Sequence, residues 1–338
     1  MNGGPRIAVL GAGSVGCFVG GAWQSAGLPV TFIGRKKVSR AVDEHGLTLS
    51  DYGGWRLHLP PGDIDYRVGP EALEDADIIL VTVKSGDTAQ AASEIAAHGR
   101  DGATVLSFQN GISNIETLEQ GLGGRFEIAR GIVAFNVVQL GKGQFHKAVA
   151  GNLWSEARDA TQLLAERSPD GPAALKLSSN MLELAWGKLL INMNNAVNAL
   201  SGKTLIDELQ KRDYRLVFAA CIEEGLGLLR RAGVQPAKVG PLPFPLLVRA
   251  LRSPDLLFNH LFFRSWKIDP KARSSMSDDL AEGRKTEVDY LNGELIRLAE
   301  RLRMDAPVSR AIVELVHKAE AGAAPLSAAA LRKAVLGR

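Results

Sequence analysis

A glycine-rich turn near the start of the chain limits its fold more than any other feature. Residues 7–10 (Ile-Ala-Val-Leu) are a short apolar run without charge, which predicts a buried parallel strand. Gly11, Gly13 and Gly16 follow with the spacing G-x-G-x-x-G, and they open a predicted helix. In such a unit the glycines permit a tight turn, a close approach of the backbone to a pyrophosphate, and packing of the helix on the sheet.

The start of that helix offers N–H groups and a partial positive charge, both of which favour phosphate. We therefore predict a dinucleotide site. Its residues are Gly11, Ala12, Gly13, Ser14, Val15 and Gly16. A glycine-rich turn that binds no ligand is the alternative.

The end of the next predicted strand indicates which nucleotide binds. NAD-selective sites usually place Asp or Glu about 20 residues beyond the glycines, where it binds the ribose 2′-hydroxyl. This chain instead has Arg35, Lys36 and Lys37 after the apolar residues 29–33, and no acid before Asp43. Three cations suit a 2′-phosphate, which Arg35 can bind through two parallel hydrogen bonds. We predict NADPH as the cofactor, with a solvated basic turn as the alternative.

Length and composition are those of an ordinary globular protein with two domains. The chain has 338 residues, of which 46% are apolar and 23% charged, and its net charge is +3. That charge is too small to indicate a nucleic acid or a membrane as partner, and no apolar run approaches the roughly 20 residues that span a bilayer. Cys17 and Cys221 lack metal-ligand spacing, so we predict no metal site and no disulfide. The first strand begins too early to leave room for a signal peptide, and we expect a cytoplasmic protein.

Strands and helices alternate over the first half of the chain. The apolar runs 77–83 and 103–108 predict two more buried strands, and the Ala-rich residues 88–98 predict a helix between them. This alternation is typical of a doubly wound parallel sheet in a Rossmann-like α/β domain, where ligands bind beyond the carboxyl ends of the strands. Lys84 and Asn110 directly follow the two runs, so we expect both side chains beside the nucleotide.

The remaining patterns set the domain organisation. Residues 36–69 are a polar stretch with one half-exposed strand at 55–59, and we expect three strands between 131 and 154 to close the edge of the sheet. Strand signals end near residue 180. Helices are then predicted over 182–200, 205–232, 246–261, 275–281, 287–302 and 307–321. We expect a Rossmann domain over residues 1–178 and an all-α domain over 179–338.

A lysine and two asparagines share one face of the first helix in this second domain. Lys188 and Asn192 are one turn apart, and Asn195 follows at i+7. Polar groups stacked in this way are unusual in a stretch that otherwise resembles a core helix. They predict a proton donor beside substrate-binding amides. A surface stripe with a solvated lysine and asparagines is the alternative.

Two predicted helix starts lie close together further along the chain. Ser275-x-x-Asp278 and Thr286-x-x-Asp289 have capping-box-like spacing, with a glycine between them. In one continuous helix Ser275 and Glu287 would be about 18 Å apart, too far to share a small ligand. Two short helices allow both starts to face one ligand, and a Ser hydroxyl at a helix start suits a carboxylate. Ordinary helix capping explains the same spacing.

These motifs and their order resemble the 2-dehydropantoate 2-reductase (ketopantoate reductase) family over nearly the whole chain. The resemblance implies NADPH-dependent reduction of 2-dehydropantoate to (R)-pantoate, in the pathway to pantothenate and coenzyme A. The matching segments are Gly11-Ala12-Gly13-Ser14-Val15-Gly16, Val81-Thr82-Val83-Lys84, Gln109-Asn110-Gly111, Trp186-x-Lys188-Leu189-x-x-Asn192, and Ser274-Ser275-Met276 leading to Thr286-Glu287-Val288-Asp289-Tyr290-Leu291-Asn292-Gly293.

The resemblance also implies roles for individual residues. Lys84 and Asn110 would contact the cofactor, and Asn110 would lie near the substrate as well. Lys188 would donate the proton. Glu287 would lie at the junction of cofactor and substrate, where it would orient Lys188 or the ligands. Asn192 and Ser275 would bind the substrate.

The chain departs from the family pattern at one position. The family has a second asparagine four residues after the one that matches Asn192, and this chain has Ala196 there. Asn194, Asn195 and Asn198 are the candidates for this second substrate amide, because Asn195 fits the helical face and Asn198 fits the residues that follow. A changed amide geometry leaves the identity of the 2-oxo acid open.

Other functions share parts of this pattern. A reductase of another small branched 2-oxo acid would use the same site. A non-catalytic NADPH-binding sensor would not need Lys188, Asn110 and Glu287 together. A 3-hydroxyacid or glycerol-phosphate dehydrogenase would lack the match around Ser275 and Glu287. A small 2-oxo acid is the partner that we predict, and both a monomer and a homodimer fit the sequence.

Overall fold

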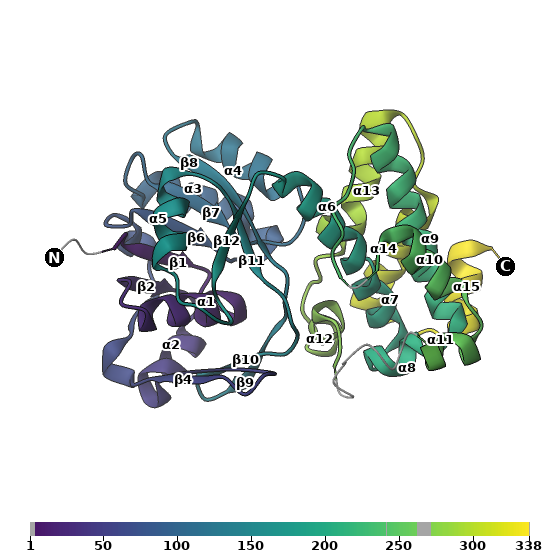
Figure 1. Cartoon of the computed structure of the whole chain (residues 1–338), viewed down its shortest axis with the longest axis horizontal. Helices are drawn as coiled ribbons and strands as arrows, with labels where there is room; N and C mark the ends of the chain where they lie inside the picture. The colour runs from purple at the N-terminus through teal and green to yellow at the C-terminus, as the bar shows by residue number, and fades with distance from the viewer. Residues whose placement is uncertain (1–3, 241, 262–271, 338) are drawn as a thin grey trace. The chain divides into compact units, whose positions relative to one another are not determined.

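The computed structural model describes residues 4–240, 242–261 and 272–337 of the chain. It contains two compact units, Met1–Met181 and Leu182–Arg338, both drawn in Figure 1. The first unit is an α/β domain built on a mainly parallel sheet, and the second is helical. The predicted fold class is confirmed.

An eight-stranded sheet forms the centre of the first unit. Six of its strands are parallel, and the other two run in the opposite direction at one edge. In spatial order the strands are β12 (Leu175–Ser178), β11 (Leu153–Glu156), β8 (Glu127–Val133), β7 (Thr104–Ser107), β6 (Ile78–Val81), β1 (Ile7–Leu10), β2 (Val30–Ile33) and β5 (Asp65–Arg67).

Helices cover both faces of this sheet because its central strands are apolar on both sides. Successive side chains of a strand point to opposite faces. Ile7 and Val9 of β1 belong to one buried cluster, which also contains residues of α1 (Ser14–Ser25) and α5 (Asp159–Arg167). Ala8 and Leu10 belong to another, with residues of two other helices. Those helices are α3 (Thr88–His98) and α4 (Asn114–Leu122), and Figure 1 shows the two layers.

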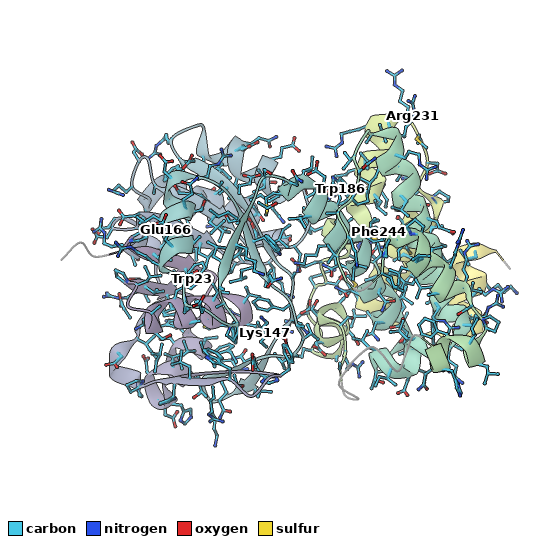
Figure 2. The ribbon with its side chains drawn as sticks, viewed as in Figure 1. Trp23, Lys147, Glu166, Trp186, Arg231 and Phe244 are labelled. Carbon is cyan, nitrogen blue, oxygen red and sulfur yellow. The ribbon has the colours of Figure 1, made fainter. Side chains whose placement is uncertain are left out.

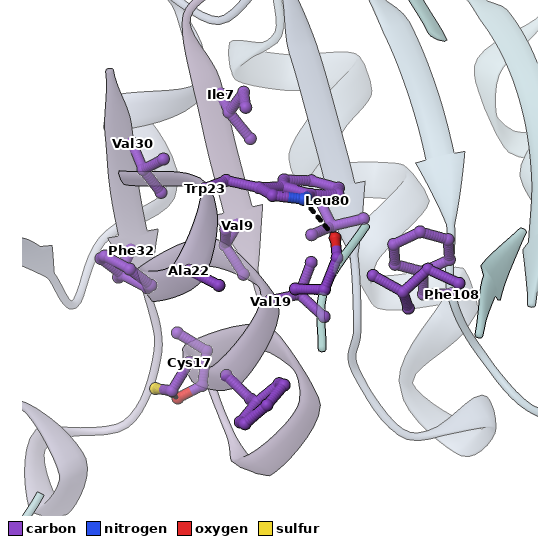
Figure 3. Packing of buried hydrophobic residues seen from close by; sticks show 14 of the residues in the cluster. Ile7, Val9, Cys17, Val19, Ala22, Trp23, Val30, Phe32, Leu80 and Phe108 are labelled. Atoms are coloured by element: carbon purple, nitrogen blue, oxygen red, sulfur yellow. Dashed lines mark hydrogen bonds between the residues drawn. The ribbon is translucent and has the colours of Figure 1, made fainter. Parts of the chain in front are cut away.

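Trp23 anchors α1 in its layer. Its side chain is fully buried, and its indole N–H donates a hydrogen bond to the carbonyl oxygen of Ala173 at 3.0 Å, the dashed line in Figure 3. The indole also lies beside Phe108, with ring centroids 6.2 Å apart. A buried Trp whose N–H is satisfied contributes apolar area without leaving an unpaired donor. Trp23 therefore packs α1, the helix that follows Gly11 and Gly13, tightly against the sheet.

A second sheet of four strands packs beside α1. Its order is β4 (Arg56–Leu59), β3 (Leu47–Asp51), β10 (Gln144–Lys147) and β9 (Val137–Gly141). The expectation that all strands between 131 and 154 close the edge of the main sheet is therefore wrong for β9 and β10, and right for β8 and β11. The buried side chains of Leu49 and Phe145 share a cluster with Phe18 of α1. Burial of this apolar face against α1 explains why the strands leave the main sheet.

Lys147, labelled in Figure 2, fixes the end of β10. Its ammonium donates hydrogen bonds to the carbonyl oxygens of Gly151 and Pro172, both at 2.8 Å, and lies 4.0 Å from the centre of the Phe135 ring. Burial lowers the pKa of Lys147, and the charge of Asp51 opposes that change. The lysine thus joins the second sheet to the chain before β12.

Residues 36–69 contain more regular structure than the predicted polar stretch. They form α2 (Lys36–His45), strands β3, β4 and β5, and a short 3-10 turn, η1 (Pro61–Asp63). Two further 3-10 turns, η2 (Pro70–Leu73) and η3 (Ser85–Asp87), follow. The pattern predicts no helix here because only Val38 and Val42 of α2 are buried. The other positions of α2 are mostly charged, so the segment is polar overall although its two buried valines share one face.

The second unit is a bundle around α9, which packs against most of the other helices that the structure describes in this unit. No helix among the described residues combines the length and apolar character needed to cross a membrane. The helices are α6 (Met181–Asn192), α7 (Asn194–Ser201), α8 (Leu205–Leu209), α9 (Arg212–Arg231), α10 (Phe244–Arg252), α11 (Asp255–Leu261), α12 (Ser275–Ala281), α13 (Val288–Leu302), α14 (Pro307–Glu320) and α15 (Ala328–Leu336).

Several predicted helices are interrupted. The expected helix over 182–200 breaks at Met193, and the one over 205–232 breaks between α8 and α9. The expected helix over 246–261 breaks at Ser253 and Pro254, because proline has no N–H to continue the ladder. The sequence pattern also misses α15, which has a single buried residue, Leu331.

Candidate functional site

Gly11, Gly13 and Gly16 have three different surroundings. Gly11 has φ +93°, and a Cβ there would lie 2.5 Å from the backbone nitrogen of Val83. A Cβ on Gly16 would lie 2.6 Å from Thr82 Oγ1, so only glycine lets α1 pack this closely. At Gly13 a Cβ would meet only a carbonyl oxygen, 3.8 Å away, so the space beside the backbone is open. This is the arrangement that a tight turn, a helix–sheet contact and a bound pyrophosphate require.

Two side chains from other segments hold the turn. Thr82 Oγ1 donates a hydrogen bond to the carbonyl oxygen of Gly11 at 2.9 Å, and the Tyr66 hydroxyl donates to that of Ala12 at 2.8 Å. Thr82 lies in one of the segments that carry the family resemblance, whereas no sequence signal singles out Tyr66. Both bonds satisfy carbonyl groups that the turn takes out of regular structure.

The N-terminus of α1 is open to an anion. Its first helical hydrogen bond runs from the N–H of Cys17 to the carbonyl of Gly13, at 2.9 Å. The N–H groups of Ser14, Val15 and Gly16 therefore have no acceptor within the helix. These donors, the open space at Gly13 and the helix dipole fit a phosphate group. The donor set therefore fits the phosphate groups of a dinucleotide.

The three cations after β2 lie at the start of α2. Arg35 is the N-cap residue of that helix, and the side chains of Arg35, Lys36 and Lys37 are exposed. Burial raises the pKa of the Tyr66 hydroxyl, and the positive charge of Arg35 acts against that increase. Since Tyr66 also bonds to Ala12, the arginine lies near the glycine turn.

Lys84 and Asn110 follow the ends of β6 and β7, and a hydrogen bond joins their two loops. The Ser85 hydroxyl donates to the carbonyl oxygen of Asn110 at 3.0 Å, and Asn114 Nδ2 donates to that hydroxyl at 3.1 Å. Lys84 is exposed and Asn110 partly exposed. The structure therefore brings the two predicted cofactor residues onto adjacent, mutually supported loops.

Gln109 adds further hydrogen bonds between the same two loops. Its side-chain nitrogen donates to the Val83 carbonyl at 3.2 Å and to the Thr88 hydroxyl at 2.7 Å. The Thr88 hydroxyl is 2.8 Å from Asn114 Oδ1, so the network closes on itself. Ser85, Thr88 and Asn114 were not singled out by the sequence, because buried polar partners from different loops leave no periodic pattern.

In the helical unit, Lys188 lies in the middle of α6 and Glu287 immediately before α13. Desolvation of the ammonium lowers the pKa of Lys188 to about 8, and the negative charge of Glu287 opposes this decrease. The two residues therefore interact electrostatically although they are far apart in the sequence. A lysine with a pKa close to neutrality is a typical functional group rather than a solvated surface one.

Glycines bring the helices that carry these two residues together. A Cβ on Gly225 of α9 would lie 2.4 Å from Leu190 of α6 and 3.2 Å from Leu295 of α13. A Cβ on Gly187, next to Lys188, would lie 2.1 Å from the carbonyl oxygen of Ala237. Both glycines cost helix propensity, and close packing explains their presence in the helices.

The asparagines around the break in α6 and α7 divide into two groups. Asn192 and Asn195 are partly exposed, whereas Asn194 and Asn198 are buried. Asn198 Nδ2 donates to Glu208 Oε2 at 2.9 Å, and Asn194 Nδ2 donates to the same oxygen at 3.3 Å. Burial raises the pKa of Glu208 to about 8, and the two amide hydrogen bonds act in the opposite direction. Asn198 and Asn194 thus donate hydrogen bonds to a buried carboxyl group.

Ser274, and not Ser275, caps α12. The hydroxyl of Ser274 accepts a hydrogen bond from the N–H of Ser277 at 3.1 Å and donates one to the carbonyl oxygen of Asn195 at 3.0 Å. The predicted capping role of Ser275 is therefore wrong by one residue. The side chain of Ser275 is exposed, and among the described residues no partner bonds to its hydroxyl. This hydroxyl has no structural role in the described chain.

The two units supply complementary chemistry. The first presents backbone donors and cations suited to a dinucleotide, and the second presents an ammonium of lowered pKa with a carboxylate and amides nearby. Among the described residues, no group of three His, Cys, Asp or Glu side chains could hold a metal ion. The ammonium of Lys188 in the second unit is a group that can deliver a proton to a carbonyl oxygen that gains charge.

Sequence models of one family match both units. The model described as "Ketopantoate reductase PanE/ApbA" matches residues 7–159, and "Ketopantoate reductase PanE/ApbA C terminal" matches residues 180–320. The 2-dehydropantoate 2-reductase of Pyrococcus abyssi is 28% identical over 327 residues, which cover 94% of this chain and 98% of that protein.

Solved structures of the same size share the fold. A PanE/ApbA family ketopantoate reductase from Ralstonia eutropha JMP134 superposes with a TM-score of 0.79 at 28% identity, covering 94% of this chain and 98% of that one. A D-mandelate dehydrogenase solved with NADH and anilino(oxo)acetate has a TM-score of 0.77 at 20% identity, with the same coverage.

Proposed function

This chain belongs to the ketopantoate reductase family, and on that premise we propose that it reduces 2-dehydropantoate to (R)-pantoate with NADPH. It is an oxidoreductase of a nicotinamide-dependent family. The nucleotide role is assigned to residues 1–178 and the substrate role to residues 179–338. We also propose that it works in the cytoplasm.

The observation that carries this proposal is the environment of Lys188. A general acid works best when its pKa lies near the working pH, because it is then protonated and still gives up its proton readily. Desolvation brings the pKa of Lys188 to about 8, and Glu287 stabilises the protonated form. A solvated lysine would keep its ordinary pKa of about 10.4 and be a poorer donor. Lys188 and Glu287 are thus the proposed catalytic residues.

The nucleotide-binding residues come from the first unit. We assign the pyrophosphate to the turn formed by Gly11, Ala12, Gly13, Ser14, Val15 and Gly16. A bound nicotinamide cofactor would supply the hydride that reduces the ketone carbon. Arg35 would bind the 2′-phosphate, while Lys84 and Asn110 would contact the cofactor, supported by the hydrogen-bonded loops described above.

In the second unit, Lys188 Nζ would donate its proton to the former carbonyl oxygen of the substrate. Asn192 and Asn195 are the amides with exposed surface, and Ser275 contributes a hydroxyl. These groups, with Asn110 of the first unit, would bind the carboxylate and the distal hydroxyl of the substrate. We assign Asn198 a different task, since both ends of its amide already bond to protein atoms.

A second candidate is the reduction of another small branched 2-oxo acid. Ala196 replaces the family's second asparagine, and Asn198, one of its possible substitutes, is buried. The exposed amides are therefore not arranged as in the family pattern. Such a change would alter which substituent next to the ketone of the substrate the site accepts. The proton donor and the cofactor site would stay the same.

Both proposals are tested by following NADPH oxidation with 2-dehydropantoate, in parallel with NADH and with 2-oxoisovalerate. The highest kcat/KM is expected with 2-dehydropantoate and NADPH. Faster turnover of 2-oxoisovalerate would favour the second candidate. Binding of NADPH without turnover of any 2-oxo acid would contradict both, and would point to a non-catalytic nucleotide sensor.

A further inference from the structure

The residue before Glu287 is held by a carboxylate from the end of another helix. Glu320 is the last residue of α14, and its side chain is only 7% exposed. Its Oε1 accepts hydrogen bonds from both the N–H and the hydroxyl of Thr286, each at 2.8 Å. Its Oε2 accepts one from Lys285 Nζ at 3.1 Å. One carboxylate thus fixes two successive residues of the segment that leads to Glu287.

A second bond from α14 lies on the other side of Glu287. His317 is one turn before Glu320, and its Nε2 is 3.1 Å from Asp289 Oδ2. Both side chains are about half exposed, so this contact is weaker than the buried one. The last turn of α14 therefore holds the chain both before and after Glu287.

Glu287 joins α13 through its backbone, since its carbonyl oxygen accepts a hydrogen bond from the Tyr290 N–H at 3.0 Å. It is the N-cap residue, with φ −101° and ψ 25°, and lies outside the regular helix. The interaction energy of two opposite charges weakens as the distance between them increases. A small displacement of Glu287 would therefore change how strongly it stabilises the ammonium of Lys188. The hydrogen bonds from Thr286 to Glu320 hold the backbone next to Glu287.

We propose that Glu320 is a positioning residue, which holds Thr286 so that Glu287 stays at the distance from Lys188 that the reaction requires. This inference rests on the proposed function of Lys188 and Glu287. Burial alone would raise the pKa of the Glu320 carboxyl, but the hydrogen bonds from Thr286 and the bond and charge of Lys285 hold it below its ordinary value. Glu320 is thus an ionised acceptor at neutral pH, and a charged acceptor makes the stronger hydrogen bond.

Two substitutions separate positioning from simple stabilisation. Glu320→Ala removes the acceptor for Thr286, whereas Glu320→Gln keeps an oxygen that accepts from it. Glu314→Gln is the matched control, since Glu314 lies on the same helix and forms an exposed pair with Lys318. Steady-state kinetics and the pH profile of kcat/KM are measured on each folded variant, together with NADPH binding.

Glu320→Ala is expected to lower kcat about 10- to 100-fold, because a displacement near 1 Å at a catalytic group has effects of this order. NADPH affinity should change much less than kcat, since the phosphate groups of the nucleotide are assigned to residues of the other unit. The alkaline limb of the profile should move to lower pH by about 0.5 or more, because Lys188 loses part of the stabilisation by Glu287. Glu320→Gln should recover most of the activity, and Glu314→Gln should match the wild type.

A purely structural role would lower the melting temperature of Glu320→Ala while leaving kcat and the alkaline limb of the folded enzyme unchanged. That result would overturn the proposal. If Glu320→Ala does not fold, Thr286→Val serves instead, because it removes one of the two bonds to Glu320 and should give a smaller change in the same direction. An unchanged profile in that variant would also overturn it.

The proposal can be tested even if the enzyme reduces no 2-oxo acid. The pKa of Lys188 is then measured from the pH dependence of its acetylation, followed by mass spectrometry. A lower pKa in Glu320→Ala than in the wild type supports the positioning role whatever the substrate. An equal pKa in both proteins contradicts it, independently of the proposed activity.

Discussion

The side-chain oxygen of Asn198 accepts a hydrogen bond from the backbone N–H of Ser274, at 2.9 Å. The nitrogen of the same amide donates to Glu208. Asn198 therefore ties α7 to the start of α12, the helix that carries Ser275. A buried amide with partners at both ends is a structural link, and Asn195 is therefore the asparagine that we propose as the second substrate amide.

Asn198→Ala and Asn195→Ala should have opposite effects. Asn198→Ala leaves the buried N–H of Ser274 without its acceptor and removes one of the two amide donors to the Glu208 carboxyl, so we expect the free energy of unfolding to fall by roughly 2–4 kcal/mol. Asn195→Ala should change stability by less than about 1 kcal/mol and raise KM for the 2-oxo acid. Urea unfolding and steady-state kinetics measure both. A stable Asn198→Ala with a raised KM would instead identify Asn198 as the second substrate amide.

Lys188→Ala should lower kcat by about 10²- to 10⁴-fold, the usual contribution of a general acid. NADPH binding should be unaffected, because the nucleotide is assigned to the first unit. Single-turnover reduction and fluorescence titration with NADPH measure the two quantities separately. Near-normal kcat in this variant would show that another group supplies the proton.

The rate of reduction should depend on pH through the same lysine. Its pKa is about 8, so the protonated donor predominates below that pH and is lost above it. We expect kcat/KM for reduction to be level below about pH 8 and to fall about tenfold per pH unit above it. Glu287 raises this pKa, so Glu287→Gln should move the limb to lower pH. An alkaline limb that does not move in Glu287→Gln would contradict the coupling of the two residues.

Arg35→Ala should weaken NADPH specifically. Loss of a charge-assisted pair with the 2′-phosphate costs about 1.5–3 kcal/mol, which corresponds to roughly 10- to 100-fold in KM for NADPH. KM for NADH should not change, since NADH has no 2′-phosphate. Arg40→Ala is the control, because Arg40 is exposed on the same helix but follows the helix start. An equal loss for both nucleotides would show that Arg35 does not select between them.

Glu208 should make the protein less stable as pH rises. Its pKa is about 8 in the folded protein against 4.5 as the ordinary value, so the folded state binds more protons between these pH values. The stability linked to this group is therefore present below pH 4.5 and is lost as pH rises through 8. Glu208→Gln removes the titrating group. From pH 5.5 to pH 8.5 its free energy of unfolding should rise by about 1–3 kcal/mol relative to that of the wild type, as measured by urea unfolding.

Asp207→Asn provides the comparison for Glu208→Gln, because Asp207 is the exposed neighbouring acid. It should show a much smaller pH-dependent difference. Equal behaviour of the two variants would mean that Glu208 is ionised in the folded protein at neutral pH.

The sequence was most informative where function depends on local backbone geometry. A buried strand, three glycines and a helix start are consecutive residues, so their spacing alone predicts the turn that Gly11, Gly13 and Gly16 form. The parallel sheet follows from the alternation of apolar runs with helices, and the family from the order of the motifs. The roles of Lys188, Glu287 and the amides stay predictions.

Helical periodicity places Lys188 and Asn192 on one face of α6, but it cannot say what packs against that face. It also cannot place Asn195 and Asn198, because the break at Met193 interrupts the periodicity. The second sheet was missed for a similar reason. The pairing of β3 with β10 joins segments about a hundred residues apart, and the pattern of either strand alone does not specify its partner.

The sequence by itself therefore determined the glycine-rich turn, the fold class and the family. Only the tertiary structure decided which asparagines are buried, that Glu208 is buried beside two amides that donate to it, and that Glu320 bonds to the chain beside Glu287. Local spacing records what one segment can form, because backbone conformation and helix faces depend on neighbouring residues. Burial, altered pKa values and hydrogen bonds between distant segments depend on which surfaces meet, and that is settled only when the whole core packs.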